Sequence, residues 1–339
     1  MDPSDGEEDC VTVESKAAAI RLGVIGFGIM GERLLRVALD HDPALVTVAG
    51  VWDPSPAAME RLARDLPQVT PLASAADVIE SSDCIYVASP PASHLGYARE
   101  AFARGKAVFC EKPLAVDVAE AEAFMREAEA AGVRGAVNFP FTSAPAVDQL
   151  QRWMTEDAVG PVERVEVEIG FAQWPRPWQV DAAGWLDARA QGGYVREVGS
   201  HFLFLARRLF GPLRLENATI SYPEAGRSER AMTAGLRAGS IPVSISSGVG
   251  TTAKPDHNIF RITGPKGSIR LRDWAVAERL IDGDWREAPD SLPNEALRAL
   301  VLQRQLEKVT AMTRGQPQDL ATLQEAAEVQ RIVETILRS

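Results

Sequence analysis

The sequence has few cysteines, no long hydrophobic run and no excess of basic residues. Its cysteines, Cys10, Cys84 and Cys110, are scattered and form no C-x-x-C pair, which excludes a zinc knuckle of that type, disfavours a disulfide framework and favours a reducing cytoplasm. No apolar run reaches the length that spans a bilayer, so we expect no membrane partner. Lys and Arg number 36 against 47 Asp and Glu, a net charge of −11, so there is no basic field to hold a nucleic-acid backbone.

The remaining composition is that of an ordinary globular protein. Apolar residues make up 46% and charged residues 24% of the 339 residues, a length that predicts two domains. Residues 1–18 are acidic and lack the basic start and apolar stretch of a secretory signal, so we interpret them as a flexible lead-in. The change of pattern near residue 140 places the two domains at 19–139 and 140–339.

The first domain alternates short β-rich runs with segments of helical period. Such alternation is typical of parallel β-α-β units, whose strands are covered on both faces and are mostly apolar. A helix is predicted over 118–131, with Gly132 at its C-terminal cap. We therefore predict an α/β, doubly wound parallel sheet. Its expected strands are 20–25, 45–53, 84–88, 107–110 and 135–139.

The second domain has longer strands with strict alternation. In residues 164–171, Val165, Val167, Ile169 and Phe171 share one side, which indicates a sheet with one wet face. A final helix beginning at Leu320 is expected to pack back onto the core. These patterns predict an α+β domain with an open, mostly antiparallel sheet. Its other expected strands are 217–222, 231–236, 241–247, 258–263 and 268–271.

A glycine-rich loop joins the first expected strand to a helix. The sequence G-F-G-I-M-G contains Gly26 for a tight turn, Gly28 for close approach of a pyrophosphate and Gly31 for contact between helix and strand, with Phe27, Ile29 and Met30 between them. The next strand ends at Asp53, 22 residues after Gly31, which is the ribose-binding position of a dinucleotide fold. Because an Asp there repels a 2′-phosphate and Pro54 supplies no cation, the pattern favours NAD over NADP.

Two further stretches follow strands of the same sheet. Residues 88–95 read A-S-P-P-A-S-H-L and residues 108–115 read V-F-C-E-K-P-L-A. Ligands of open α/β sheets bind at the carboxyl ends of the strands, so both stretches are expected beside the cofactor. The cofactor-binding candidates in them are Ser89, Pro90, Pro91, His94, Glu111 and Lys112.

Together with G-G-Y-V-R-E-V-G-S-H at 192–201, these signatures resemble the Gfo/Idh/MocA oxidoreductase family. The resemblance implies a Rossmann domain, an NAD(P)-dependent dehydrogenase activity, and a second domain whose sheet often joins subunits, hence a homo-oligomer. It also implies that Lys112 points at the substrate hydroxyl, that Glu111 helps to hold the cofactor and that His201 acts as acid or base. Where the family usually has an aspartate, this chain has Glu197.

The residue types agree with these implied roles, because removing a hydride from a carbinol also requires a base for its proton. Glu197 and His201 are four residues apart, so a helix over 197–210 would let the carboxylate orient the imidazole. A histidine that only packs the helix is the alternative for His201. The four histidines are separated and no cysteine pair accompanies them, so we predict no metal site.

Other features leave alternatives open. Residues 138–141 read N-F-P-F where the family often has a basic or polar stretch, so a substrate contact by Asn138 would be altered. Trp174, Trp178 and Trp185 either wall the substrate pocket or serve as core or interface aromatics. The leading function is hydride transfer between NAD and a secondary alcohol of a sugar, cyclitol or related polyol, a small-molecule substrate. The alternatives are a non-catalytic NAD-binding sensor and an NAD-assisted glycoside hydrolase.

Overall fold

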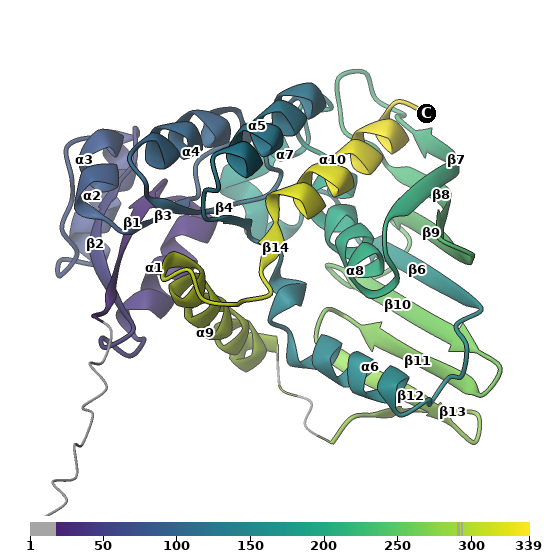
Figure 1. Ribbon diagram of the computed structural model, residues 1–339. Coiled ribbons are helices and arrows are strands. Elements are labelled where there is room, and N and C mark those ends of the chain that lie inside the picture. The colour runs from purple at the N-terminus through teal and green to yellow at the C-terminus, as the bar shows by residue number, and fades with distance from the viewer. Residues whose placement is uncertain (1–17, 290–291, 293) are drawn as a thin grey trace, which may run out of the picture.

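The computed structural model describes residues 18–289, 292 and 294–339. In this part of the chain the strands form two sheets that lie side by side, with helices around and between them (Figure 1). The expected lead-in over residues 1–18 lies outside the described residues, apart from Ala18. No helix in the described ranges is both long and apolar enough to cross a membrane.

The first sheet confirms the predicted doubly wound architecture. Its strand order is β14-β5-β4-β3-β1-β2, and every pairing is parallel except that of β14 with β5. The strands are β1 (Ile20–Ile25), β2 (Val46–Trp52), β3 (Cys84–Val87), β4 (Ala107–Cys110), β5 (Gly135–Val137) and β14 (Ala321–Thr322). The helices between the first five are α1 (Ile29–Leu39), α2 (Pro56–Asp65), α3 (Ala75–Ser81), α4 (His94–Ala103) and α5 (Val118–Ala130).

Local sequence signals set several of these helix ends. Ser55, Ser74 and Asp117 cap α2, α3 and α5 by accepting a backbone N–H with their side chains. Gly132 has a φ of +61° just after α5, the left-handed conformation expected of a C-terminal glycine cap. The predicted helix over 118–131 is therefore confirmed to within one residue.

One face of the first sheet is covered by a helix that the sequence analysis did not predict. Helix α9 (Asn294–Thr313) lies beside α1 (Figure 1) and buries Leu302, Leu306, Val309 and Met312 against the sheet. Their spacing has a helical period, so the signal was present in the sequence. Because α9 and β14 both join the first sheet, we propose that residues 294–322 belong with 19–139 rather than with the second domain.

The second sheet confirms the predicted open, mostly antiparallel arrangement. Its order is β13-β12-β11-β10-β6-β9-β8-β7, and β6 and β9 are its parallel pair. Strands β12 and β13 were not expected from the sequence. The strands are β6 (Arg164–Phe171), β7 (Leu213–Ser221), β8 (Ala231–Ala238), β9 (Ile241–Val249), β10 (His257–Gly264), β11 (Gly267–Arg272), β12 (Val276–Ile281) and β13 (Asp284–Glu287).

The alternation in β6 is a property of its two faces. Val165, Val167, Ile169 and Phe171 are all buried, whereas the residues between them are more exposed. Helices cover the buried side of this sheet, and they are α6 (Pro145–Thr155), α8 (Ser200–Phe210) and α10 (Leu323–Leu337). The connections carry the short helix α7 (Ala183–Leu186) and the tight helical turns η1 (Pro91–Ser93), η2 (Pro140–Thr142), η3 (Pro177–Ala182) and η4 (Val195–Gly199).

Helix α10 packs against α5 of the first half and α8 of the second, so it holds the two sheets together (Figure 1). It begins at Leu323, three residues later than expected, because Ala321 and Thr322 first pair with β5. Thr322 and Glu325 then form a capping box at its start.

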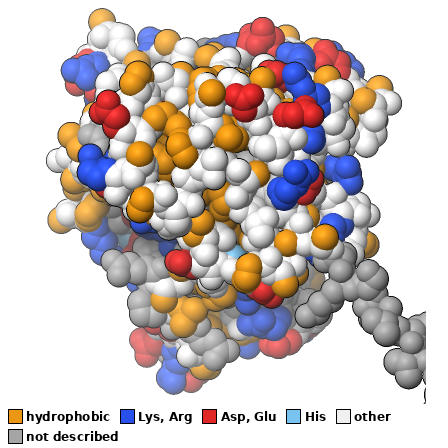
Figure 2. Space-filling view, turned by 90° about the vertical axis from the view of Figure 1, so that its left-hand side faces the viewer, with side chains coloured by type: hydrophobic (Ala, Val, Ile, Leu, Met, Phe, Trp, Pro, Cys, Tyr) orange, Lys and Arg blue, Asp and Glu red, His pale blue; other side chains and the backbone are white. Residues whose placement is uncertain are grey.

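Charged side chains of both signs are mixed on one face of the molecule. Figure 2 shows basic and acidic side chains interspersed on one face, with hydrophobic side chains in small groups between them. Cys84 and Cys110 are free thiols buried in the first sheet, while Cys10 lies outside the described residues.

Candidate active site

The glycine loop has the geometry that its sequence predicts. Gly26 has a φ of +103°, and a Cβ there would lie 2.6 Å from the backbone of Ala88 and Ser89. A Cβ on Gly31 would lie 1.9 Å from the carbonyl oxygen of Gly26, so helix and strand approach too closely for any side chain. Nothing lies within 4 Å of a Cβ placed on Gly28. The loop is therefore open at the position where a diphosphate would approach, just before α1 begins.

Asp53 follows β2 and lies beside this loop. Its Oδ2 accepts the backbone N–H of Phe27 at 2.7 Å, and its Oδ1 accepts that of Ser55 at 2.8 Å. A residue that the sequence analysis did not consider, Arg61 of α2, donates to the carbonyl of Phe27 and lies 4.9 Å over its ring. The ribose end of the loop therefore contains a carboxylate and a cation.

The turn after β3 is tied to the loop after β4 by His94. Ser89 and Pro90 precede η1, which begins at Pro91, and His94 starts α4. The buried His94 ring contacts the carbonyl oxygens of Ser89 at 2.7 Å through Nε2 and of Pro113 at 2.9 Å through Nδ1. Burial lowers the pKa of His94 despite these carbonyls. The position agrees with a role in shaping the cofactor turn.

Beneath this loop lies a buried polar network centred on Glu111. Tyr86 donates its hydroxyl to Glu111, and Asn138 donates its amide to the same carboxylate oxygen at 2.7 Å. Gln305 of α9 donates to the amide oxygen of Asn138 at 2.7 Å. Burial raises the pKa of the Glu111 carboxyl. Asn138 is 1% exposed and its amide supports Glu111, and its expected contact with the substrate stays a prediction.

Lys112 and Glu197 meet between the two sheets. The Lys112 Nζ donates to the Glu197 carbonyl oxygen at 3.0 Å and to its carboxylate at a shorter distance. The Lys112 side chain is 8% exposed and that of Glu197 25%, so the ion pair is largely shielded from water. A charge-assisted hydrogen bond in such surroundings is stronger than a surface pair.

The expected pairing of Glu197 with His201 is not what the structure shows. Residues Val195–Gly199 form a π-helical turn and α8 begins only at Ser200, so the expected helix over 197–210 is irregular at its start. Glu197 turns to Lys112 instead. Among the described residues, the buried Nδ1 of His201 has no hydrogen-bond partner. The role of His201 as acid or base, which the family resemblance implies, stays a prediction. Its expected orientation by Glu197 is wrong.

His201 lies among aromatic rings. Its ring meets those of Phe139, Phe141 and Trp274 edge-on, with centroids 5.5, 6.3 and 5.4 Å away. Trp274 comes from the turn between β11 and β12 and was not considered in the sequence analysis. Burial, and then the charges of Lys112 and Arg176, lower the pKa of His201 well below its ordinary value. The imidazole is therefore neutral near pH 7.

This burial predicts a pH dependence of stability. Below about pH 6.5 the unfolded chain binds a proton at His201 while the folded protein does not, so the free energy of unfolding falls as pH falls, by about 1.4 kcal/mol per unit. Glu111 and Glu229 act in the opposite direction, because burial raises the pKa of both carboxyls. Urea unfolding of wild type and His201→Asn between about pH 5 and 7.5 isolates the histidine. Parallel curves of stability against pH for the two proteins would contradict this role of His201.

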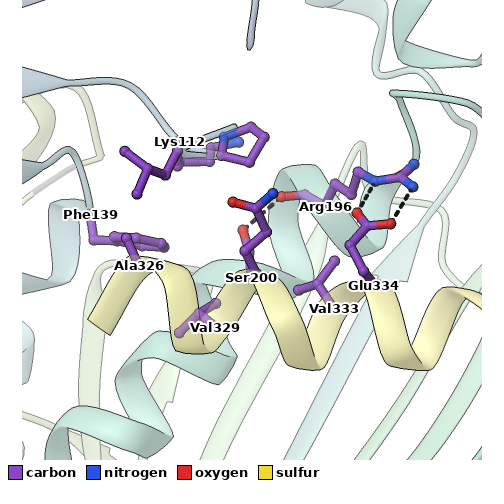
Figure 3. A pocket seen from close by; sticks show the side chains of 11 residues that line it. Lys112, Phe139, Arg196, Ser200, Ala326, Val329, Val333 and Glu334 are labelled. Carbon is purple, nitrogen blue, oxygen red and sulfur yellow. Dashed lines mark hydrogen bonds and ion pairs between the residues drawn. The ribbon is translucent and has the colours of Figure 1, made fainter. Parts of the chain in front are cut away.

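Helix α10 supports Lys112 and the π-helical turn from behind. Gln330 exchanges hydrogen bonds with the backbone of Ala115, and Glu334 binds the Arg196 guanidinium at 2.6 and 2.9 Å. Lys112, Arg196 and Glu334 lie around a small cavity (Figure 3). Its volume is about 20 Å³, which is room for about one water. The residues that carry the candidate site are therefore held from both halves of the chain.

The predicted tryptophans divide into two groups. Trp174 is 6% exposed and packs edge-on against Phe171 and Tyr194, so it is a core aromatic. Trp178 and Trp185 are 43% and 44% exposed and remain candidates for the pocket wall. In the described ranges, no group of three His, Cys, Asp or Glu side chains is placed to hold a metal ion.

Comparisons with known proteins agree with this arrangement. Residues 20–139 match the family model described as an oxidoreductase family with an NAD-binding Rossmann fold, and residues 147–270 match the GFO/IDH/MocA C-terminal domain. The chain is 27% identical over 213 residues to trans-1,2-dihydrobenzene-1,2-diol dehydrogenase of Mus musculus, and this match spans 60% of each chain. It is 28% identical over 270 residues to D-apiose dehydrogenase of Paraburkholderia graminis, covering 76% of this chain and 69% of that one.

A solved structure shows the same fold. The WlbA dehydrogenase from Bordetella pertussis, crystallised with NADH and UDP-GlcNAcA, aligns with a TM-score of 0.79 and 20% identity over 95% of both chains. The fold similarity therefore extends over both sheets.

Proposed function

The chain belongs to the Gfo/Idh/MocA family of oxidoreductases, and from this premise we propose that it transfers a hydride between NAD and a secondary alcohol of a sugar, cyclitol or related polyol. One observation carries the proposal. Lys112 is brought together with Glu197, 85 residues later in the sequence, where the strands of the first sheet end, and the charge of Lys112 also acts on His201.

The glycine loop supports a dinucleotide as the cofactor. The open approach at Gly28, the start of α1 and the carboxylate of Asp53 provide room for a diphosphate, a positive helix end and an acceptor for ribose hydroxyls. NAD, when bound, supplies the nicotinamide that accepts or donates the hydride. The protein then has to bind the alcohol, orient it and move its proton.

Lys112 and His201 are the groups suited to that work. A shielded ammonium stabilises negative charge that develops on the substrate oxygen. The neutral imidazole has a lone pair that accepts the hydroxyl proton. Glu197 holds the Lys112 Nζ through two contacts and so fixes where its charge lies.

We expect NAD to bind at least about tenfold more tightly than NADP, a difference of about 1.4 kcal/mol. The reason is that the Asp53 carboxylate would face a 2′-phosphate. Arg61 does not offset it, because its guanidinium is already engaged with the Phe27 carbonyl and lies 3.7 Å from Glu32. Dissociation constants from fluorescence titration with each cofactor measure the difference.

Arg61→Gln tests whether Arg61 binds the 2′-phosphate of NADP. If Arg61 served a 2′-phosphate, its loss would weaken NADP binding and leave NAD binding unchanged. Wild-type protein that binds NADP as tightly as NAD would contradict the assignment of Asp53.

The proposed activity is tested with purified protein, NAD and a panel of polyols, sugars and glycosides. Nicotinamide absorbance and release of free sugar are followed in the same reactions. Net reduction of NAD by an alcohol supports the proposal. Sugar release without net reduction would indicate an NAD-assisted glycoside hydrolase, and cofactor binding without either reaction would indicate a sensor.

The open face of the second sheet supports the expectation of a homo-oligomer. Strands β6, β8 and β9 leave one side uncovered by helices, and a hollow of about 380 Å³ lies there among Glu168, Thr233, Ser246 and neighbouring side chains. We propose this face as the contact between copies of the chain. Its polar side chains are typical of an interface that also contains water.

A further inference from the structure

An exposed indole contacts two guanidinium groups, one from each half of the chain. Trp178 lies in η3, after β6, and its ring centroid is 4.9 Å from the Arg33 Cζ and 4.7 Å from the Arg176 Cζ. Arg33 belongs to the first turns of α1, directly after the glycine loop, whereas Arg176 belongs to the second half. We call Arg33, Arg176 and Trp178 the arginine clamp.

Only one of the two guanidinium charges in the arginine clamp is balanced by a carboxylate. Arg176 is buried and pairs with Asp256 at 2.8 Å. Among the side chains that the structure describes, Arg33 has no carboxylate within ion-pair distance, and its guanidinium donates to the Met30 Sδ at 3.9 Å. Glu32, its neighbour, is used by Arg36 and Arg61.

A third guanidinium, Arg298 of α9, adds to this excess. Burial, then the charges of Arg298 and Arg176, lower the pKa of Arg33. A half-buried cation among like charges is unfavourable unless an anion joins them. This local excess of positive charge occurs in a protein whose net charge is −11, so it is not part of a general basic surface.

The arginine clamp lies beside the candidate site. The charge of Arg176 also acts on His201, and Arg33 follows the glycine loop on α1. A ligand that reaches from the reacting hydroxyl near His201 toward α1 would therefore meet these guanidiniums. Guanidinium groups bind carboxylates and phosphates with two parallel hydrogen bonds, which few other side chains offer.

We propose that the arginine clamp binds an anionic group, a carboxylate or phosphate, carried by the substrate, so that the substrate is an acidic sugar or polyol. The inference rests on the proposed function, since that function places the reacting alcohol near His201. The cofactor diphosphate is the other anion within reach. It already has the open loop at Gly28 and the start of α1, so we assign the arginine clamp to the substrate.

Binding rather than turnover tests the proposal. D-glucuronate, D-glucose 6-phosphate and neutral D-glucose are titrated calorimetrically into the NADH-loaded protein, and NADH binding is measured separately by fluorescence. We expect wild type to bind at least one of the two acids about tenfold or more tightly than glucose, as charge-assisted hydrogen bonds allow. This preference is expected to fall about fivefold or more in Arg33→Gln and to weaken with added salt.

Arg36→Gln is the matched control. Arg36 lies on the same helix as Arg33, and its guanidinium pairs with Glu32 at 2.7 Å outside the arginine clamp. Its substitution removes the same charge as Arg33→Gln. We expect it to keep the preference of the wild type. Arg298→Gln is a second test variant in case Arg33→Gln fails to fold.

The possible outcomes are distinguishable. Lack of binding by both acids at millimolar concentration, no preference over glucose, or a preference that survives Arg33→Gln each overturns the proposal. Weaker NADH binding in Arg33→Gln with an unchanged preference for acids would assign the arginine clamp to the cofactor diphosphate, which also overturns it. Acid binding that depends on Arg33 in a protein with no hydride transfer would support the anion site and reject the proposed function.

Discussion

Replacing Lys112 with alanine is expected to lower kcat by roughly two to four orders of magnitude, the usual size of a lost acid, base or charge-stabilising group. The side chain is 8% exposed and its Nζ is fixed by Glu197, so its charge has one defined place that alanine leaves empty. NAD affinity is expected to change little, because the glycine loop and Asp53 are separate from Lys112. Steady-state kinetics and fluorescence titration of NAD measure the two quantities.

Two variants serve as controls for Lys112→Ala. Lys266→Ala removes an exposed lysine of the second half that pairs with Asp157, and it is expected to have wild-type kinetics. Lys112→Arg keeps the positive charge, but a guanidinium does not give up its proton as an amine can. This variant therefore separates stabilisation by charge from proton transfer. Wild-type turnover in Lys112→Ala would remove Lys112 from the mechanism, and a collapse of NAD affinity would make it a cofactor ligand.

Replacing Glu197 with glutamine is expected to lower kcat by about 10- to 100-fold, which corresponds to about 1.4–2.7 kcal/mol. The change keeps the size of the side chain and removes the negative charge beside the Lys112 ammonium. Without this carboxylate the Lys112 Nζ loses its charged hydrogen-bond partner and is no longer held in one place. Glu197→Asp keeps the charge and is expected to retain most of the activity.

A double-mutant cycle shows whether Glu197 acts through Lys112 or through His201. If it acts through Lys112, Glu197→Gln has little further effect on kcat in the Lys112→Ala background. If it acts through His201, its effect there is as large as in wild type. Wild-type kcat in Glu197→Gln would show that Glu197 does not contribute to the reaction.

The fold was predictable where one local pattern determines each element. The strands of the first sheet and the alternation in β6 follow from burial on two faces or on one, and they were placed to within a few residues. Helix α9 and strand β14 were missed for a different reason. Their partners are α1 and β5, far away in the sequence, and no pattern within residues 294–322 states which sheet they join.

The residues of the candidate site could be predicted from the sequence, but the side chains that they contact could not. Spacing in an ideal helix paired Glu197 with His201, whereas Glu197, which lies in the π-helical turn, pairs with Lys112 of the first half. Tyr86, Gln305 and Trp274 gave no signal, because their contacts with Glu111, Asn138 and His201 arise only in the folded chain. Arg33 and Arg176 likewise meet on Trp178 only after both halves have folded.

The late position of β14 in the sequence affects how the protein is made. Strand β5 ends at Val137, but its outer neighbour β14 begins only at Ala321, and α9 also comes after the second sheet. At 5–20 residues per second, a ribosome needs roughly 10–40 s to make the chain between them. During that interval β5 is an unpaired strand edge and the sheet face later covered by Leu306 and Val309 is open, which are the features that promote aggregation of nascent chains. The first half of the protein therefore completes its fold only when the last part of the chain has left the ribosome.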